Sequence, residues 1–156
     1  MNTFTLRPQG EFSLRESAEF GFGQRHAAVF DGTMRLAFCL DDLAHQVGVA
    51  VTQDERGVHG TIVGRATTPV ERVAAQTARM LSLDVDACGY QAVGARDPVV
   101  ARALAIAPGL RPPLFHSPYE AAASFVLGHR ISIAQVRRLR GRLAEALGTA
   151  DRKSVV

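Results

Sequence analysis

Hydrophobic positions change their period along the chain, and this change separates a part with strands from a helical part. Apolar and polar side chains alternate in residues 28–38, as they do in a strand with one buried face. The same alternation in 46–53 and 58–64, on either side of residues 54–57, predicts a hairpin. With a short strand at 3–6, we expect about five antiparallel strands in the first 90 residues.

The dipeptide Asp31-Gly32 lies within the first alternating run. A type I′ turn needs positive φ at both central positions, and Asp-Gly is one of the pairs that favour it. We therefore expect a second hairpin whose turn is at Asp31-Gly32.

Capping residues predict where five helices begin. Four sequences fit the capping box, in which a hydroxyl accepts the N–H of the third residue and an acid or amide reaches back. These sequences are Ser13-Leu14-Arg15-Glu16, Thr68-Pro69-Val70-Glu71, Ser117-Pro118-Tyr119-Glu120 and Ser132-Ile133-Ala134-Gln135. Asp97-Pro98 adds an acidic cap followed by a fixed φ. The predicted helices are 13–21, 69–83, 98–107, 118–129 and 133–147.

The two C-terminal helices differ in their patterns. Helix 118–129 carries apolar side chains on nearly every side, so we expect neighbours to bury it all round. Helix 133–147 has one apolar stripe, made by Ile133, Val136, Leu139, Leu143 and Leu147. On a helical wheel Arg138 and Arg142 lie opposite this stripe, Arg137 lies at its border and Arg140 lies within its edge.

These patterns predict an α+β fold class: an antiparallel β-sheet with packed helices, followed by a partial all-helical segment. The domains expected are an antiparallel-sheet domain over 1–92 and the first helices of a helical domain over 93–156.

Composition adds mainly exclusions. The chain has 156 residues, of which 47% are hydrophobic, and its two cysteines lie far apart with no His or Cys nearby at zinc-ligand spacing. We expect no disulfide framework, no metal and no cofactor. Its apolar stretches are too short to span a bilayer and no leader pattern begins the chain, so we expect a cytoplasmic protein without a membrane partner.

The charges are unevenly distributed. Residues 1–97 hold nine Arg and twelve Asp or Glu, whereas residues 98–156 hold eight Arg and one Lys against three acidic residues. A basic helical segment is typical of phosphate-backbone binding, because Arg and Lys displace condensed counterions. Solvated helix faces would produce the same pattern.

A search for catalytic motifs finds no dinucleotide or phosphate loop, no His-Glu-x-x-His, no Cys-x-x-Cys and no Gly-x-Ser-x-Gly. The acidic pairs Asp41-Asp42 and Asp84-Val85-Asp86 lie where elements end, so we assign them to turns and caps. We predict no catalytic residue.

Residues 97–148, above all SPYEAAASFVLGHRISIAQV from Ser117 to Val136, resemble the helix-hairpin-helix DNA glycosylases of the bacterial 3-methyladenine DNA glycosylase II type. Upstream, residues 31–38 and 69–86 resemble the N-terminal β-sheet domain of that family. The resemblance implies a place in the base-excision repair of alkylated DNA, in which a base is flipped out of the duplex and one side chain is wedged into the gap.

The family's Leu-Gly-Gln-x-x-Ser stretch corresponds here to Leu127-Gly128-His129-Arg130-Ile131-Ser132. His129 therefore replaces a Gln, and Arg130 stands where the family places its wedging residue. The family's Leu-Pro-Gly-x-Gly hairpin and its catalytic Asp have no counterpart in this chain. We therefore expect the N-terminal half of such an enzyme, inactive alone.

The leading hypothesis is a non-catalytic remnant that binds duplex DNA weakly and non-specifically. The residues predicted to contact DNA are Gly128, His129, Arg130, Ser132, Arg137, Arg138 and Arg142. Two alternatives stay open: half of a split glycosylase completed by another chain, and a dimerising module that does not bind DNA. Both would use helices 118–147 as the interface with a second copy or a complementing chain.

Overall fold

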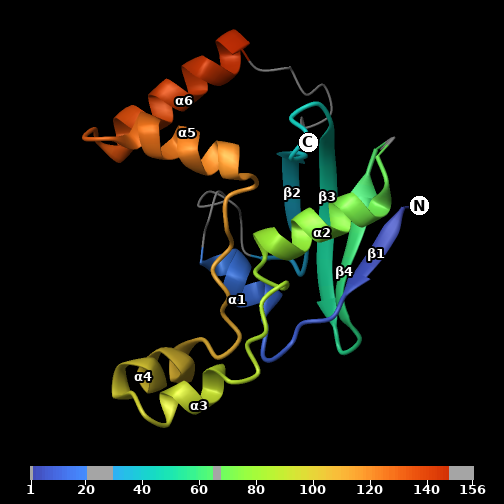
Figure 1. Ribbon diagram of the computed structural model, residues 1–156, viewed down its shortest axis with the longest axis vertical. Helices are drawn as coiled ribbons and strands as arrows, with labels where there is room; N and C mark the ends of the chain where they lie inside the picture. Colours follow the sequence, from blue (N-terminus) through green and yellow to red (C-terminus); the bar gives the residue numbers. More distant parts are fainter. Residues whose placement is uncertain (1, 21–29, 65–67, 148–156) are drawn as a thin grey trace. The chain divides into compact units, whose positions relative to one another are not determined.

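The computed structural model describes residues 2–20, 30–64 and 68–147. The chain divides into two compact units, unit 1 over residues 1–117 and unit 2 from residue 118 onward. In the described ranges unit 1 holds an antiparallel sheet and four helices, and unit 2 holds two helices (Figure 1). The α+β class is confirmed. The boundary at residues 92 and 93 depends on the family resemblance and stays a prediction.

The described part of the sheet has four antiparallel strands in the order β1-β4-β3-β2. They are β1 (Thr3–Leu6), β2 (Met34–Cys39), β3 (Gln46–Asp54) and β4 (Gly57–Val63). The predicted β3–β4 hairpin is confirmed, with Asp54 opposite Gly57. Gly57 has a φ of +139°, and a Cβ at this position would lie 2.6 Å from the carbonyl oxygen of Leu6. Only glycine permits both this turn and the close approach of the end of β1.

The turn expected at Asp31-Gly32 was wrongly predicted. Gly32 has a φ of +92°, but Asp31 lacks the positive φ that a type I′ turn needs, and neither Phe30 nor Asp31, directly before Gly32, is in a strand. Residues 28–29 of the expected first arm lie outside the described residues. The carboxylate of Asp31 accepts hydrogen bonds from the backbone N–H of Thr33 and the guanidinium of Arg35. This local Asx turn competes with the hairpin for the same residues.

The core of unit 1 lies between the sheet and helix α2 (Val70–Met80), which crosses the sheet in Figure 1. Alternate residues of β3 and β4 are buried, and they are Val47, Val49, Val51, Val58 and Ile62. From α2, Val73 and Met80 are buried two turns apart on the same face. Each such side chain contributes about 1.5–3 kcal/mol relative to its exposed state, so this sandwich supplies most of the unit's hydrophobic stabilisation.

Helix α2 is shorter than the predicted 69–83. Ser82 has a φ of +54°, and the N–H of Leu83 bonds back to the carbonyl of Ala78, so the helix ends in a left-handed cap. Leu81 and Leu83 are buried beyond the end, which is why the apolar pattern continued past it. The capping box expected at Thr68 is also wrong, because the helix begins at Val70 without a side-chain cap.

Helix α1 (Leu14–Glu19) begins as predicted, with Ser13 Oγ accepting the N–H of Glu16 at 3.2 Å. Residue 21, at the end of the predicted helix 13–21, lies outside the described residues. The Glu16 carboxylate does not reach back to Ser13. It accepts the N–H of Gly109 at 2.9 Å, while the N–H of Ser13 donates to the carbonyl of Gly109 at 2.8 Å. The N-terminus of α1 is thus attached to a segment more than 90 residues away.

Two further helices of unit 1 lie outside the sheet region, α3 (Tyr90–Gly94) and α4 (Pro98–Ile106). The start of α4 is confirmed, because the Asp97 carboxylate accepts the N–H groups of Val99 and Val100. The short helix α3 was not predicted, since no capping side chain marks its start.

Unit 2 is a helical hairpin of α5 (Pro118–Gly128) and α6 (Ile133–Leu147). Both helices match the predicted ranges to within one residue. The sequence also predicts that Gly148 ends α6 as a left-handed cap, and this residue lies outside the described residues.

Candidate nucleic-acid interface

The turn between α5 and α6 brings together four of the seven residues predicted to contact DNA. Gly128 is the last residue of α5, His129 and Arg130 form the turn, and Ser132 caps α6. The predicted capping box is confirmed in both directions, because Ser132 Oγ accepts the N–H of Gln135 at 3.3 Å and Gln135 Oε1 accepts the N–H of Ser132 at 2.8 Å. These bonds fix the turn against the first turn of α6.

Arg130 has a φ of +56°. This left-handed region commonly ends helices, but usually with glycine, and a side chain there costs about 1–2 kcal/mol. Arg130 is exposed, and His129 packs its ring on Phe125 with centroids 6.2 Å apart. The turn therefore holds an arginine in a conformation that glycine would adopt with less strain.

Helix α6 presents the remaining predicted residues, Arg137, Arg138 and Arg142, as exposed side chains. Among the residues that the structure describes, none of these three arginines has an ion-pair partner, and neither has Arg130.

Arg140 differs from its neighbours on α6. Its Nη2 lies 3.0 Å from Glu120 Oε1 of α5, which joins the two helices. This explains why Arg140 lies within the edge of the apolar stripe. In residues 118–147 five arginines stand against two glutamates, and one glutamate is occupied by Arg140, so the hairpin keeps a strong positive field.

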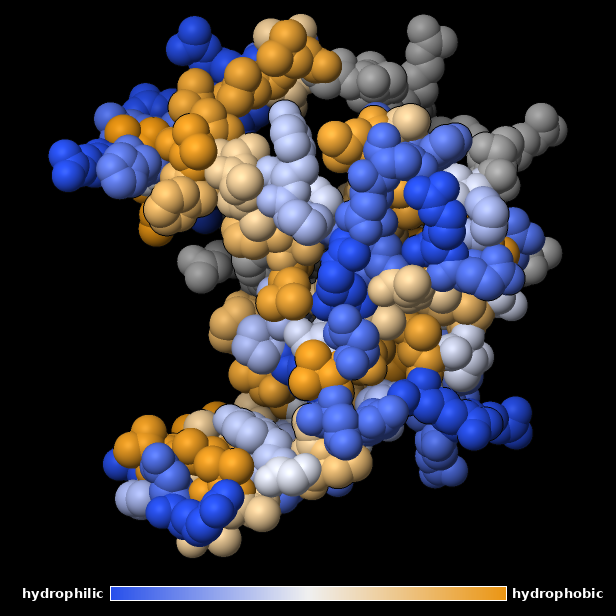
Figure 2. Space-filling view, viewed as in Figure 1, coloured by the Kyte–Doolittle hydropathy of each residue, from blue (hydrophilic) through white to orange (hydrophobic). Residues whose placement is uncertain are grey.

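The burial expected for α5 was wrongly predicted, since α5 has no buried residue. Tyr119, Phe125 and Val126 are 66%, 74% and 71% exposed. At the ends of the stripe on α6, Ile133 and Leu147 are also exposed, whereas its middle residues are partly buried. Hydrophobic side chains are visible on the surface of the hairpin in Figure 2.

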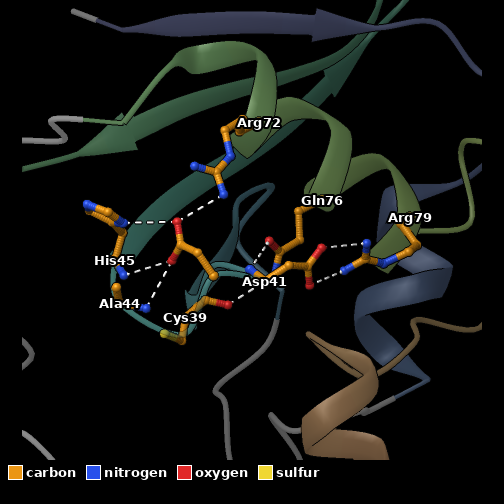
Figure 3. A network of polar contacts seen from close by, with 8 residues as sticks. Cys39, Asp41, Ala44, His45, Arg72, Gln76 and Arg79 are labelled. Carbon is orange, nitrogen blue, oxygen red and sulfur yellow. Dashed lines mark hydrogen bonds and ion pairs between the residues drawn. The ribbon is translucent and has the colours of Figure 1, made fainter.

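A second polar cluster joins the β2–β3 turn to α2 in unit 1 (Figure 3). The two terminal nitrogens of the Arg79 guanidinium each donate to one carboxylate oxygen of Asp41 at 2.8 Å, and Arg72 Nη2 lies 2.9 Å from Asp42 Oδ2. The Gln76 amide donates to the carbonyls of Cys39 and His116 and accepts the N–H of Asp41. The carboxylates of Asp41 and Asp42 and the amide of Gln76 all have partners within the protein, so we assign the cluster a structural role.

The turn assignment is confirmed for Asp42 and Asp86, one member of each acidic pair. Asp42 accepts the N–H groups of Ala44 and His45, and the bond from Ala44 is the largest cause of a pKa well below the usual value for Asp. Asp86 accepts the N–H of Cys88, which likewise lowers the pKa of Asp86. Neither carboxylate is held in the raised-pKa state that a general acid needs.

Arg111 is the polar residue that the sequence analysis missed. Only 6% of it is exposed, and its guanidinium donates to four backbone carbonyls from two distant segments. These belong to Gln9, Glu11, Ser82 and Val85. Arg111 therefore holds the segment before α1 against the segment after α2.

In the described ranges no three His, Cys, Asp or Glu side chains gather as they would around a metal ion. The helices described there are all too short or too polar to cross a membrane. Cys39 and Cys88 are both free thiols.

No protein-family model matches the chain, and no curated protein sequence matches it either. The resemblance to DNA glycosylases therefore rests on the residues quoted above, and its functional content is a proposal.

Proposed function

We propose that the α5–α6 hairpin binds the phosphate backbone of duplex DNA, in a protein related to the 3-methyladenine DNA glycosylase II type of base-excision repair enzymes. The observation that carries this proposal is the set of four arginines, Arg130, Arg137, Arg138 and Arg142, exposed at one turn and one helix without ion-pair partners in the described residues. Phosphate contacts fix position and carry no sequence information, so the binding is non-specific.

The conformation of Arg130 supports this proposal. Strained backbone conformations gather at functional positions because the side chain is needed there. A glycine at this turn would relieve the strain and remove the charge. The turn residues Gly128, His129 and Ser132 shape the backbone that presents Arg130, and the capping bonds of Ser132 with Gln135 hold this turn against α6.

The proposal does not include base excision by these 156 residues. They contain no Leu-Pro-Gly-x-Gly signature, and no carboxylate takes the place of the family's catalytic Asp. Without that carboxylate, nothing stabilises the positive charge that develops on the sugar during excision. We therefore propose that the chain binds DNA and that it binds alkylated and undamaged duplexes equally well.

The test is fluorescence anisotropy with a labelled 20-base-pair duplex at several salt concentrations. We expect a dissociation constant of about 10⁻⁶ to 10⁻⁴ M near physiological salt. Four phosphate contacts give a slope of about −3.6 when the logarithm of the association constant is plotted against the logarithm of the salt concentration, since each contact contributes about −0.9. Replacing Arg137, Arg138 and Arg142 by Ala should leave a slope of about −0.9.

A matched control keeps the same loss of net charge. The triple variant Arg56→Ala, Arg96→Ala and Arg102→Ala removes three exposed arginines of unit 1. It should lower the affinity less than threefold. If the two triple variants lose affinity equally, binding depends on total charge and the hairpin is not the interface.

A further inference from the structure

His59 on β4 joins two polar side chains on the face of the sheet that points away from the core. Its neighbour Val58 is fully buried in the core, and successive side chains of a strand point to opposite faces. Nδ1 of His59 lies 3.1 Å from Thr5 Oγ1 on β1, and Nε2 lies 2.7 Å from Asp54 Oδ1 at the end of β3. A hydroxyl, an imidazole and a carboxylate from three strands thus form one chain of contacts.

The register of β1 and β4 explains the close approach of Thr5 and His59. In antiparallel strands hydrogen-bonded pairs alternate with non-bonded pairs, whose side chains lie closer together. The N–H of Ile62 donates to the carbonyl of Asn2, and Thr5 opposes His59 three pairs further along, so these two residues form a non-bonded pair. The backbone N–H of Thr5 therefore points away from β4, toward the edge of the described sheet, where β1 is the outermost strand.

The carboxylate of Asp54 sets the tautomer of His59. The hydrogen bond from His59 is the first cause that holds the pKa of Asp54 below its usual value, so Asp54 is ionised and can only accept. Nε2 consequently carries the proton of the neutral imidazole, and Nδ1 keeps a lone pair that accepts the hydroxyl hydrogen of Thr5. A base in this state, held by a third group and in contact with a hydroxyl, is the arrangement that activates serine or threonine as a nucleophile.

We propose that Thr5 Oγ1 is an acyl-acceptor site for small activated esters, with His59 as its general base and Asp54 as the residue that positions His59. Oγ1 attacks the carbonyl carbon of the ester while its proton passes to Nδ1. The bond from that carbon to the leaving oxygen then breaks, and the leaving oxygen takes the electron pair and the proton from Nδ1. The N–H of Thr5 adjoins Oγ1 and donates to the negative oxygen that forms during the attack.

The surroundings of Thr5 limit the substrate and the rate. The nearest opposing and same-face side chains are short and uncharged, and they are Thr3, Thr52 and Thr61. They offer no charge to a charged acyl group, so acetyl is the expected size and kind. Because the side chains of His59 and Asp54 are 31% and 56% exposed, the acceleration should lie near the lower end of the range of about 10²–10⁴ for general base catalysis.

The probe is p-nitrophenyl acetate, added to the full chain. Mass spectrometry of the N-terminal peptide should show an acetyl group on Thr5, and neutral hydroxylamine should remove it, because hydroxylamine cleaves esters and leaves amides. Lys153 is the sole lysine of the chain, so acetylated amines give little background. Thr5→Val should abolish the labelling, Thr5→Ser should keep it, and Thr3→Val, on the same strand and face, should change it less than about twofold.

His45 supplies a matched control for His59. It is exposed and lies 3.0 Å from Asp42, but no described hydroxyl contacts its other ring nitrogen. His59→Gln should slow the acetylation of Thr5 at least tenfold, and His45→Gln less than about twofold. Circular dichroism checks that each variant keeps its fold.

Asp54→Asn tests the positioning role. Asparagine keeps the oxygen that accepts the N–H of Arg56 in the turn, so a three- to tenfold slower acetylation with an unchanged melting temperature would separate positioning from turn structure. Wild-type protein without a hydroxylamine-sensitive acetyl group on Thr5 would overturn the proposal, and so would equal effects of the two His variants. The outcome does not depend on DNA binding, since all these residues belong to unit 1.

Discussion

Replacing Arg111 by methionine should be the most destabilising single change among the described arginines. Methionine has a similar length and fills most of the same space, but it has no donors. The change leaves the carbonyls of Gln9, Glu11, Ser82 and Val85 without their guanidinium. It also removes the cation that lies 6.0 Å from the ring of Phe12.

The magnitude follows from the number of bonds and from burial. A hydrogen bond to a charged group contributes about 1.5–3 kcal/mol, and a buried acceptor left unsatisfied costs about 1–3 kcal/mol. The four contributions do not add, because the segments relax and water reaches some of the carbonyls. We therefore expect a loss of about 3–5 kcal/mol from the free energy of unfolding, below the sum of the four separate contributions.

The assay is urea denaturation followed by far-ultraviolet circular dichroism. Arg102→Met, at an exposed position of α4, is the control and should change the free energy of unfolding by less than about 0.5 kcal/mol. Arg111→Lys keeps the charge but loses the planar fork, so its loss should be intermediate and keeps the test informative if the Met variant does not fold. A loss below about 1 kcal/mol for Arg111→Met would refute the reasoning.

Four other predictions test the turn, the chemistry and the pH dependence. Arg130→Gly should raise the melting temperature by relieving the left-handed strain and should weaken DNA binding. A lower melting temperature would contradict the strain argument. Arg130→Ala combined with Arg138→Ala should lower the affinity equally for undamaged and alkylated duplexes, and a preference for the lesion lost on changing Arg130 alone would show base recognition. The chain should release no 3-methyladenine from alkylated duplex over time, as followed by chromatography of the free base. Asp42 has a lowered pKa in the folded state, so its contribution to stability is present above the usual Asp pKa and disappears as the pH falls through the folded value. The difference in melting temperature between wild type and Asp42→Asn should therefore be largest near pH 6–7 and shrink below about pH 4.

Elements with local signals could be predicted from the sequence. The starts of α4 and α6 depend on a side chain and N–H groups two or three residues away, as at Asp97 and Ser132. The β3–β4 hairpin depends on alternation and a glycine in its turn. In these cases the interacting groups are only a few residues apart, so the local sequence pattern contains all of them.

Features that depend on distant partners could not be predicted. Arg111 follows Gly109 and Leu110 in an extended segment, and its partners are backbone carbonyls 26 to 102 residues away. Every residue has a backbone carbonyl, so the sequence does not show which carbonyls accept from a side chain. In the sequence, Arg111 therefore looks like any surface arginine. Asp31-Gly32 failed for the opposite reason, because a local bond from Thr33 to Asp31 competes with the hairpin turn.

The sequence predicted which residues form the candidate site, but it did not predict the contacts that these helices make. Helical periodicity separated Arg138 and Arg142 from the apolar stripe, and the structure leaves both exposed. It did not predict that Glu120 would neutralise Arg140. Nor could the apolar pattern of α5 show whether neighbours would cover it, because burial depends on what else the molecule places there.

The bonds from α1 to residues 109 and 111 can form only late during synthesis of the chain. The strands of the described sheet are all complete once Val63 has been made, and Ser13 and Ser17 lie between β1 and β2. The partners of these serines, Gly109 and the carbonyl of Arg111, come 94 or more residues later. At about 5–20 residues per second, the ribosome needs about 5–19 s to supply them. During that interval Ser13 and Ser17 lack the backbone partners that hold them in the finished fold.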